Sequence, residues 1–478
     1  MLLRNTIYNL IGLGAPLLVA VASIPMLIAA LGTERFGLLT LIWAVVSYFG
    51  LFDLGLGRAL TQQLAVLFAK EEHEEVGPFV ATATLLMGVL GVLAGALMAA
   101  AAPWGVSLIR SVPDRQEAVT AVYAMAMAMP AIVLTSGFRG ILEAKHAFGT
   151  INLIRLPMGL FTFLGPLAVV IYGEPRLDWI AWALAAGRVA GCAVHAWFAW
   201  RALPADCGHM APRRELIRSL GVAGGWLSVS NVISPFMGYV DRFVIGAIVS
   251  AAAVAYYVTP QELVTKLWIV PGALTAVLFP TFAAQMARRD AQTWVLFGKA
   301  IHGLWLVLLP ITLALALFAH ELISAWIGHD FAIHSALLLQ IFAFGILINC
   351  LAHVPFTLVQ SAGASRATAL VHCTELPFFL ALLWWSTARF GVTGAAVAWL
   401  TRIGVDTVLM FALSTHLSQR PASALMRTPV VAGAMLTLLA FVGVLLPSIA
   451  QRACWLAVAA VATAYAGFRS LRTTGSRR

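Results

Sequence analysis

The chain has 478 residues, of which 61% are hydrophobic and only 10% are charged, and its mean hydropathy is +0.91. A soluble globular domain carries about 25% charged residues, so this composition excludes a soluble protein and indicates a polytopic membrane protein. The net charge of +10 invites a nucleic-acid interpretation, which the distribution of the charges does not support.

Apolar segments of membrane length follow one another along the whole chain. About 20 apolar residues are needed to span a bilayer as a helix. We expect an all-α membrane fold of about 14 transmembrane helices. The segments lie near residues 7–31, 36–60, 78–102, 118–142, 151–172, 178–202, 220–249, 252–283, 298–320, 333–360, 367–388, 391–415, 428–446 and 452–470.

Lys and Arg residues are distributed unevenly between the two sides of this arrangement. An even number of spans places both termini on one side, and twenty of the thirty Lys and Arg residues then lie on that side. Six lie on the opposite side and four lie inside spans. Because Lys and Arg concentrate in cytoplasmic loops, we expect both termini in the cytoplasm, and no nucleic-acid partner.

The segment from Gly32 to Leu64 departs from the pattern of a lipid-facing helix. Asp53 and Arg58 lie within or at the end of its apolar run, and Gly55 and Gly57 lie between them. A charge at bilayer depth normally faces a helix bundle or a wet cavity, and glycines allow close helix packing. We expect this stretch to line a cavity.

The two halves of the chain resemble each other in layout, with an offset of about 216–219 residues between residues 31–47 and 249–265. Such duplication is typical of transporter bundles. The predicted domains are a six-helix N-terminal lobe (1–202), a cytoplasmic linker (203–219), a pseudo-symmetric six-helix lobe (220–415), and two additional helices with a basic cytoplasmic tail (416–478).

Two stretches resemble a known family. The run LGTERFGLLTLIWAVVSYFGLFDLGLGRALTQQLA at 31–65 resembles the amino-terminal signature of bacterial O-antigen and exopolysaccharide flippases. These Wzx-like proteins belong to the multidrug/oligosaccharidyl-lipid/polysaccharide exporter superfamily. The run YVDRFVIGAIVSAAAVAYYV at 239–258 resembles the seventh and eighth spans of that family.

The resemblance implies two six-helix lobes around a central cavity that opens alternately to each side of the bacterial inner membrane. It implies a cargo of oligosaccharide linked to undecaprenyl diphosphate, used for surface polysaccharide synthesis. Membrane lipids, a polysaccharide polymerase and other assembly proteins would then be partners.

Cations inside the spans are the candidates for holding a diphosphate head group, because they can replace its hydration. Arg188 lies at mid-depth with no acidic residue three or four positions away. Lys266 and Arg402 also lie near mid-depth, and Arg58 lies near the cytoplasmic end of its span. We expect Arg58, Arg188, Lys266 and Arg402 to bind the head group.

Acidic residues inside the spans are the candidates for gating or for coupling to an ion gradient. Glu375 stands alone except for His372, three residues earlier, and is the foremost coupling candidate. Arg139–Glu143, Glu262–Lys266 and Arg402–Asp406 have the i,i+4 spacing of helical ion pairs, which neutralise themselves or open when substrate arrives. The gate or coupling candidates are Asp53, Asp241, Arg242, Glu262, Glu375 and Asp406.

No cofactor, metal site or enzymatic activity is predicted. The five cysteines are scattered without a CxxC spacing, and no GxxxxGK[ST] phosphate loop is present. An H⁺ or Na⁺ gradient is therefore the expected source of energy.

Three alternatives come from other classes. A multidrug antiporter of the same superfamily would carry a dominant buried acid in an amino-terminal span, but the first span contains none. A membrane glycosyl polymerase or transferase needs a sizeable external loop, and the longest one predicted covers only residues 103–117. A flippase for the peptidoglycan precursor lipid II shares the architecture and stays open.

Overall fold

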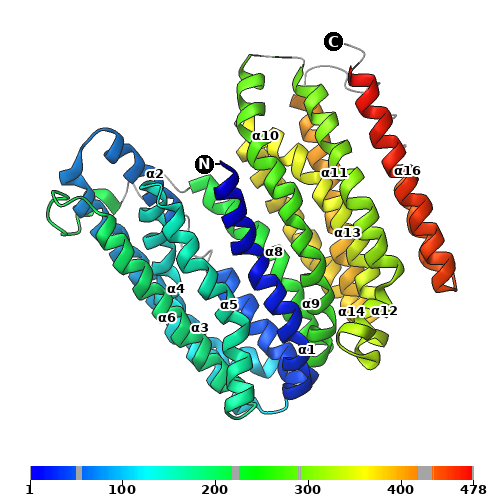
Figure 1. Cartoon of the computed structure of the whole chain (residues 1–478). Helices are drawn as coiled ribbons and strands as arrows, with labels where there is room; N and C mark the ends of the chain where they lie inside the picture. The colour runs from blue at the N-terminus through cyan, green and yellow to red at the C-terminus, as the bar shows by residue number, and fades with distance from the viewer. Residues whose placement is uncertain are drawn as a thin grey trace. The chain divides into compact units, whose positions relative to one another are not determined.

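The computed structural model describes residues 2–49, 56–217, 225–288, 290, 292–417, 433 and 435–475 (Figure 1). Side chains are described for residues 15–45, 56–217, 233, 235–288, 290, 292–416, 433 and 435–465. The predicted gate residue Asp53 lies outside the described residues. The chain forms two compact units, Met1–Ala255 and Tyr256–Arg478, and each is treated by itself; the predicted lobe boundaries stay a prediction.

The described part of the chain is helical throughout and contains no β-strand. Nine of its helices are long and apolar enough to cross a membrane, because their apolar runs exceed about 20 residues. The first unit contains α1 (Leu2–Phe49), α2 (Leu56–Ala69), η1 (His73–Glu75), α3 (Val76–Leu108), α4 (Arg115–Ala144), α5 (Phe148–Tyr172), α6 (Leu177–Ala202), α8 (Gly225–Ile248) and the start of α9 (Ala251–Thr265).

The second unit begins within α9 and continues to the C-terminus. It contains η2 (Lys266–Trp268), α10 (Ile269–Ala287), α11 (Gln292–Leu317), α12 (Ala319–Trp326), α13 (His329–Ser361), α14 (Ser365–Leu417), η3 (Gly443–Leu445) and α16 (Ile449–Gly475).

Two glycines divide the two longest helices. Gly32 interrupts α1 with φ 78° and ψ 160°, and Gly391 interrupts α14 with φ 59° and ψ −141°. Glycine adopts a positive φ without steric cost because it has no Cβ atom, which explains why both breaks occur at glycines. Divided at these breaks, and counted with α8 and two shorter apolar helices near the C-terminus, the described helices agree with the predicted fold of about 14 spans.

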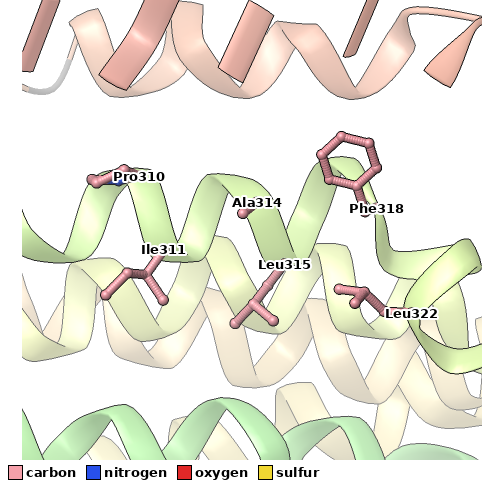
Figure 2. A pocket seen from close by; sticks show the side chains of 6 residues that line it. All are labelled: Pro310, Ile311, Ala314, Leu315, Phe318 and Leu322. Carbon is pink, nitrogen blue, oxygen red and sulfur yellow. The ribbon is translucent and has the colours of Figure 1, made fainter. Parts of the chain in front are cut away.

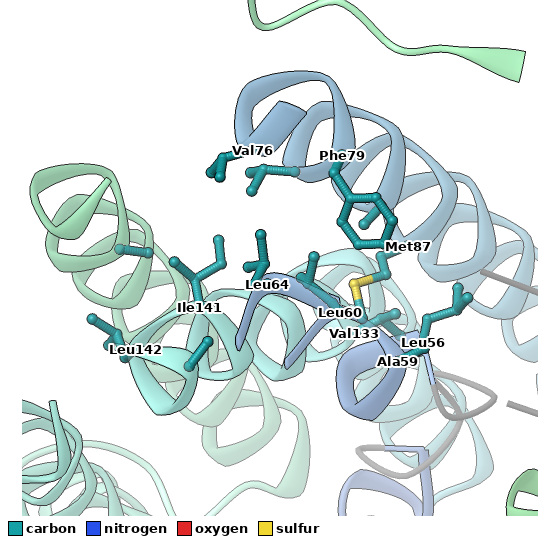
Figure 3. Close-up of a cluster of buried hydrophobic side chains, with 14 of the residues drawn as sticks. Leu56, Ala59, Leu60, Leu64, Val76, Phe79, Met87, Val133, Ile141 and Leu142 are labelled. Atoms are coloured by element: carbon teal, nitrogen blue, oxygen red, sulfur yellow. The ribbon is translucent and has the colours of Figure 1, made fainter. Parts of the chain in front are cut away.

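A cluster of buried apolar side chains holds one end of the first unit together (Figure 3). Leu60 and Leu64 of α2 meet Met87 of α3 and Val133 and Ile141 of α4, and each of these side chains is at most 1% exposed. The segment after α6 packs against the same cluster with its own apolar side chains, namely Leu203, Cys207, Met210 and Leu216.

Hydrogen bonds attach this segment, which the sequence predicts as a cytoplasmic linker, to the residues that precede and begin α3. The backbone amide of Gly77 donates to the Cys207 carbonyl at 2.6 Å. Arg213 forms an ion pair with Glu75 at 2.8 Å, and its backbone amide donates to the Thr82 hydroxyl at 2.9 Å. Residues 203–217 are therefore a docked part of the first unit.

A titratable pair strengthens this attachment. His73 Nδ1 lies 3.1 Å from Asp206 Oδ2. The hydrogen bond to His73 holds the pKa of Asp206 below its ordinary value, because it stabilises the carboxylate form.

A second junction in the first unit joins the turn after α3 to the last turn of α8 and the start of α9. The Arg110 amide donates to the Gly246 carbonyl at 3.0 Å, and the Ala251 amide donates to the Arg110 carbonyl at 3.1 Å. Gly37 of α1 lies so close to Ala251 that a Cβ atom there would clash with the Ala251 carbonyl oxygen. Three segments that are distant in sequence thus meet at this junction.

Candidate functional site

Arg188 is the mid-span cation of the first unit. It lies on α6, eleven residues after the helix begins at Leu177, and its side chain is half-buried. It forms no hydrogen bond or ion pair with any residue in the described part of the chain. A guanidinium at this depth requires an anion or water, so its position fits the predicted role in binding a head group without testing it.

Arg58 lies in the first turn of α2 and is exposed. Exposure leaves a guanidinium at the start of α2 accessible to a ligand. Its predicted role stays a prediction.

Asp241 and Arg242 are both buried in α8, with exposed fractions of 0% and 5%. The Arg242 amide donates to Asp241 Oδ1 at 2.9 Å, and the guanidinium lies over the Tyr239 ring at 4.9 Å. Such burial excludes an anchor in the lipid head-group layer, which requires an accessible side chain. A gating role for this pair stays a prediction.

Glu262 and Lys266 form the predicted helical ion pair in the second unit. The Lys266 ammonium lies 2.7 Å from Glu262 Oε2, and the two side chains are 42% and 37% exposed. Lys266 belongs to the short 3₁₀ turn η2, which separates α9 from α10 near the middle of the span Ala251–Ala287. The pair Arg139–Glu143 also forms, at 3.3 Å.

The third predicted pair, Arg402–Asp406, does not form. Asp406 Oδ1 instead faces His372 Nε2 at 3.6 Å. The Arg402 guanidinium lies 5.5 Å from the Phe379 ring, and its Nε atom is buried without a hydrogen-bond partner. Helical spacing brings two residues onto one face, but side chains on the other half of the broken helix α14 compete for the carboxylate.

Glu375 completes this buried group on α14. It is 7% exposed, and both of its carboxylate oxygens are buried without a hydrogen-bond partner. His372, Arg402 and Asp406 are its electrostatic neighbours, and His353 of α13 interacts with Asp406. Two carboxylates, two imidazoles and one guanidinium thus lie together in buried or half-buried positions, and we call this group the α14 charge cluster. His353 is not among the residues that the sequence predicts for the site, because it lies 53 residues before Asp406 and shares no local pattern with it.

An open apolar groove lies on α11 and α12 of the second unit (Figure 2). Its volume is about 510 Å³, and Pro310, Ile311, Ala314, Leu315, Phe318 and Leu322 line it. This lining offers no charged or hydrogen-bonding side chain to a diphosphate. The groove is therefore not a candidate for the head-group site.

Solved transporter structures share the fold of this chain. An inward-facing multidrug resistance transporter of the MATE family, in the MOP superfamily, aligns with a TM-score of 0.70 and 15% identity, over 88% of this chain and 96% of that one. An outward-facing MATE transporter aligns with a TM-score of 0.62 and 18% identity, over 89% and 96%. A MOP-superfamily transporter from Pyrococcus furiosus aligns with a TM-score of 0.60 and 15% identity, over 87% and 96%. At these identities the similarity shows the fold alone.

Sequence comparison gives a more specific result. The chain is 29% identical over 417 residues to the Shigella flexneri protein named "Putative O-antigen transporter", and the alignment covers 87% of this chain and 98% of that protein. Residues 2–286 match the family described as Polysaccharide biosynthesis protein. The chain, a multi-pass membrane protein with the fold of the MOP-superfamily transporters, belongs to the polysaccharide biosynthesis protein family.

Proposed function

We propose that this protein is a flippase that moves an oligosaccharide linked to undecaprenyl diphosphate across the bacterial cytoplasmic membrane by alternating access, for O-antigen or exopolysaccharide synthesis. The observation that carries the proposal is the near full-length similarity to a protein named as an O-antigen transporter. The relatives are named as transporters, which supports a transport role and not an enzymatic one.

Charged groups of each unit would supply the chemistry that such a cargo needs. A diphosphate entering the membrane must exchange its hydration for charge-assisted hydrogen bonds. Arg188, Lys266 and Arg402 would provide these bonds within the spans, and Arg58 would do so at the start of α2. Asp241, Arg242 and Glu262 would contribute to gating, together with Asp53.

The α14 charge cluster is the proposed coupling site. Glu375 is buried with no hydrogen bond to its carboxylate, and such a carboxylate gains or loses a proton readily when its surroundings change. Protonation of Glu375 would alter its attraction to Arg402 and its repulsion from Asp406. A change of that kind can bias one conformation over the other. A proton or a sodium ion would thus drive the cycle, with no further cofactor.

Membrane vesicles of known orientation test the translocation. In cells depleted of this protein, we expect lipid-linked oligosaccharide to accumulate on the cytoplasmic face, where a membrane-impermeant sugar-modifying enzyme detects it. Wild-type protein should reverse the accumulation, and Arg188→Ala should not. Arg139→Ala is the control, since Arg139 belongs to an exposed ion pair. If Arg188→Ala also reverses the accumulation, Arg188 is not part of the head-group site. If depletion does not change the face on which the lipid-linked oligosaccharide is found, the proposed flippase function is contradicted.

Reconstituted vesicles test the coupling. Uptake driven by an imposed pH gradient or by an imposed sodium gradient should identify the ion, and Glu375→Gln should abolish that dependence, because the amide does not titrate. Glu143→Gln serves as the control, since the Glu143 side chain is 39% exposed and pairs with Arg139. Gradient-driven uptake that survives Glu375→Gln would place the coupling site elsewhere.

A further inference from the structure

The break between α9 and α10 places polar side chains near the middle of a membrane span. Pro271 lacks the N–H that would bind the carbonyl of Leu267, four residues earlier, so the helix tightens into η2 at Lys266–Trp268. A 3₁₀ turn keeps its backbone hydrogen-bonded at membrane depth, and the charged side chains that it carries face either the protein interior or a water-filled cavity. The exposure of this segment decides between these two cases.

The Glu262–Lys266 pair remains more than one-third exposed at this depth. Charged side chains facing lipid at the bilayer centre are costly, and those that occur face the bundle interior or an aqueous cavity. The exposed face of η2 is therefore better suited to contact with water than with lipid.

Trp268 of η2 and Asn349 of α13 together form a polar and aromatic surface beside this segment. The Trp268 indole Nε1 donates to Asn349 Oδ1 of α13 at 2.7 Å, and Trp268 is 43% exposed. Because an indole N–H only donates, Asn349 must present its carbonyl oxygen to it. The Asn349 NH₂ group, with two donors, then forms no hydrogen bond with any other described residue.

We propose that Trp268 and Asn349 form a subsite for the sugar ring next to the diphosphate of the lipid-linked cargo. The exposed indole face would pack against the apolar face of a hexose ring, while the Asn349 NH₂ group would donate to a ring hydroxyl or an acetamido oxygen. Lys266, two residues before Trp268, would hold the adjacent phosphate. The inference rests on the proposed function and names the part of the cargo that the second unit binds.

This combination of groups is selective for its ligand class. Ligand sites join apolar surface with a few fixed polar groups that set orientation, and the hydrogen bond to Asn349 fixes the indole plane. An organic cation would find the Glu262 carboxylate already neutralised by Lys266, and a bare lipid tail would leave the Asn349 donors unsatisfied. A sugar attached to a phosphate offers an anion to Lys266 and hydrogen-bond acceptors to the Asn349 NH₂ group.

Binding to the full-length protein in nanodiscs tests the subsite with two probes. One is undecaprenyl diphosphate, and the other is the same carrier with one N-acetylhexosamine attached. We expect the wild-type protein to bind the sugar-bearing carrier more tightly. Trp268→Ala and Asn349→Ala should each reduce that preference, the former by roughly tenfold, and should leave binding of the bare carrier unchanged.

Controls separate the subsite from the fold and from the proposed function. Trp182→Ala removes an indole of matched exposure, 45%, and should keep the sugar preference. Trp268→Phe keeps an aromatic face without the hydrogen bond and should fall between wild type and Trp268→Ala. Lys266→Ala should weaken binding of both carriers.

The outcomes that contradict the two proposals differ. Suppose that the wild-type protein binds the bare carrier. If Trp268→Ala then keeps the full sugar preference, or if the wild-type protein shows no sugar preference, the proposed subsite is wrong and the proposed flippase function stands. If the wild type binds neither carrier, both proposals fail.

Discussion

The carboxylate of Glu117 joins three segments of the first unit. It accepts hydrogen bonds from Arg35 Nε and Nη2 at 3.2 and 3.0 Å and from the backbone amide of Leu177 at the start of α6. It is only 5% exposed. A buried carboxylate that loses its donors, or donors that lose their carboxylate, cost free energy because no water replaces the partner.

Replacing Glu117 should therefore destabilise the protein. Glu117→Ala leaves the Arg35 guanidinium and the Leu177 amide without their acceptor, and we expect a loss of about 1–3 kcal/mol and a lower thermal midpoint in detergent. Glu143→Ala, which removes an exposed i,i+4 pair, should change stability by less than about 0.5 kcal/mol. Equal midpoints for the two variants would contradict the role of Glu117.

Charge pairs were predictable from sequence where both partners share one helical turn. Glu262–Lys266 and Arg139–Glu143 followed from their spacing and do form. Arg402–Asp406 has the same spacing and does not form, because His372 faces Asp406 across the break at Gly391. The bond from Arg35 to Glu117 spans 82 residues, so only the packing of α1 on α4 reveals it.

Close packing at the element scale is clearest where α1 meets α9. A Cβ atom on Gly37 would overlap the carbonyl of Ala251, and the Ala251 side chain is fully buried. Backbone atoms cannot rotate away as a flexible side chain can. A larger residue at position 37 must therefore move one helix relative to the other.

Gly37→Ala should consequently lower the thermal midpoint, because overpacking of a tight contact costs about 1–3 kcal/mol. Gly88→Ala in α3 provides the matched control, since nothing lies within 4 Å of a Cβ atom there. Because alanine has a higher helix propensity than glycine, Gly88→Ala should be as stable as the wild-type protein or slightly more stable. A Gly37→Ala protein as stable as Gly88→Ala would contradict the contact.

The docking of residues 203–217 is also a property of elements, since apolar packing and hydrogen bonds act together. Cys207 is half-buried there. In a background where Cys207 is the sole cysteine, Gly77→Ala and Arg213→Ala should each raise its rate of maleimide alkylation several-fold. Arg214→Ala, which removes the neighbouring exposed cation, should not; equal rates in all variants would contradict the docking.

At the scale of the whole molecule, hydropathy and charge determined most of what the sequence predicted. The spans are long apolar runs, so their number followed from bilayer thickness. The polar loop between α2 and α3 contains His73 and Glu75, which bind the docked segment. Such contacts depend on which helices become neighbours, and hydropathy does not encode this.

The bias of Lys and Arg also makes an orientation testable. A fluorescent protein fused after Arg478 should fluoresce, because the distribution of Lys and Arg predicts that this end is cytoplasmic. Alkaline phosphatase inserted after Glu174, in the turn between α5 and α6, should be active, because the same distribution predicts that this turn faces away from the cytoplasm. The reverse pattern would overturn the predicted topology.

The docked segment also has a consequence for the order of synthesis. The apolar cluster under α2, α3 and α4 receives Leu203, Cys207, Met210 and Leu216, which leave the ribosome after all of α6. The apolar cluster therefore cannot be completed when translation has reached only Ala202. A split gene that encodes the two parts as separate polypeptides should be divided after residue 217, and a division directly after α6 should yield a first chain that is degraded.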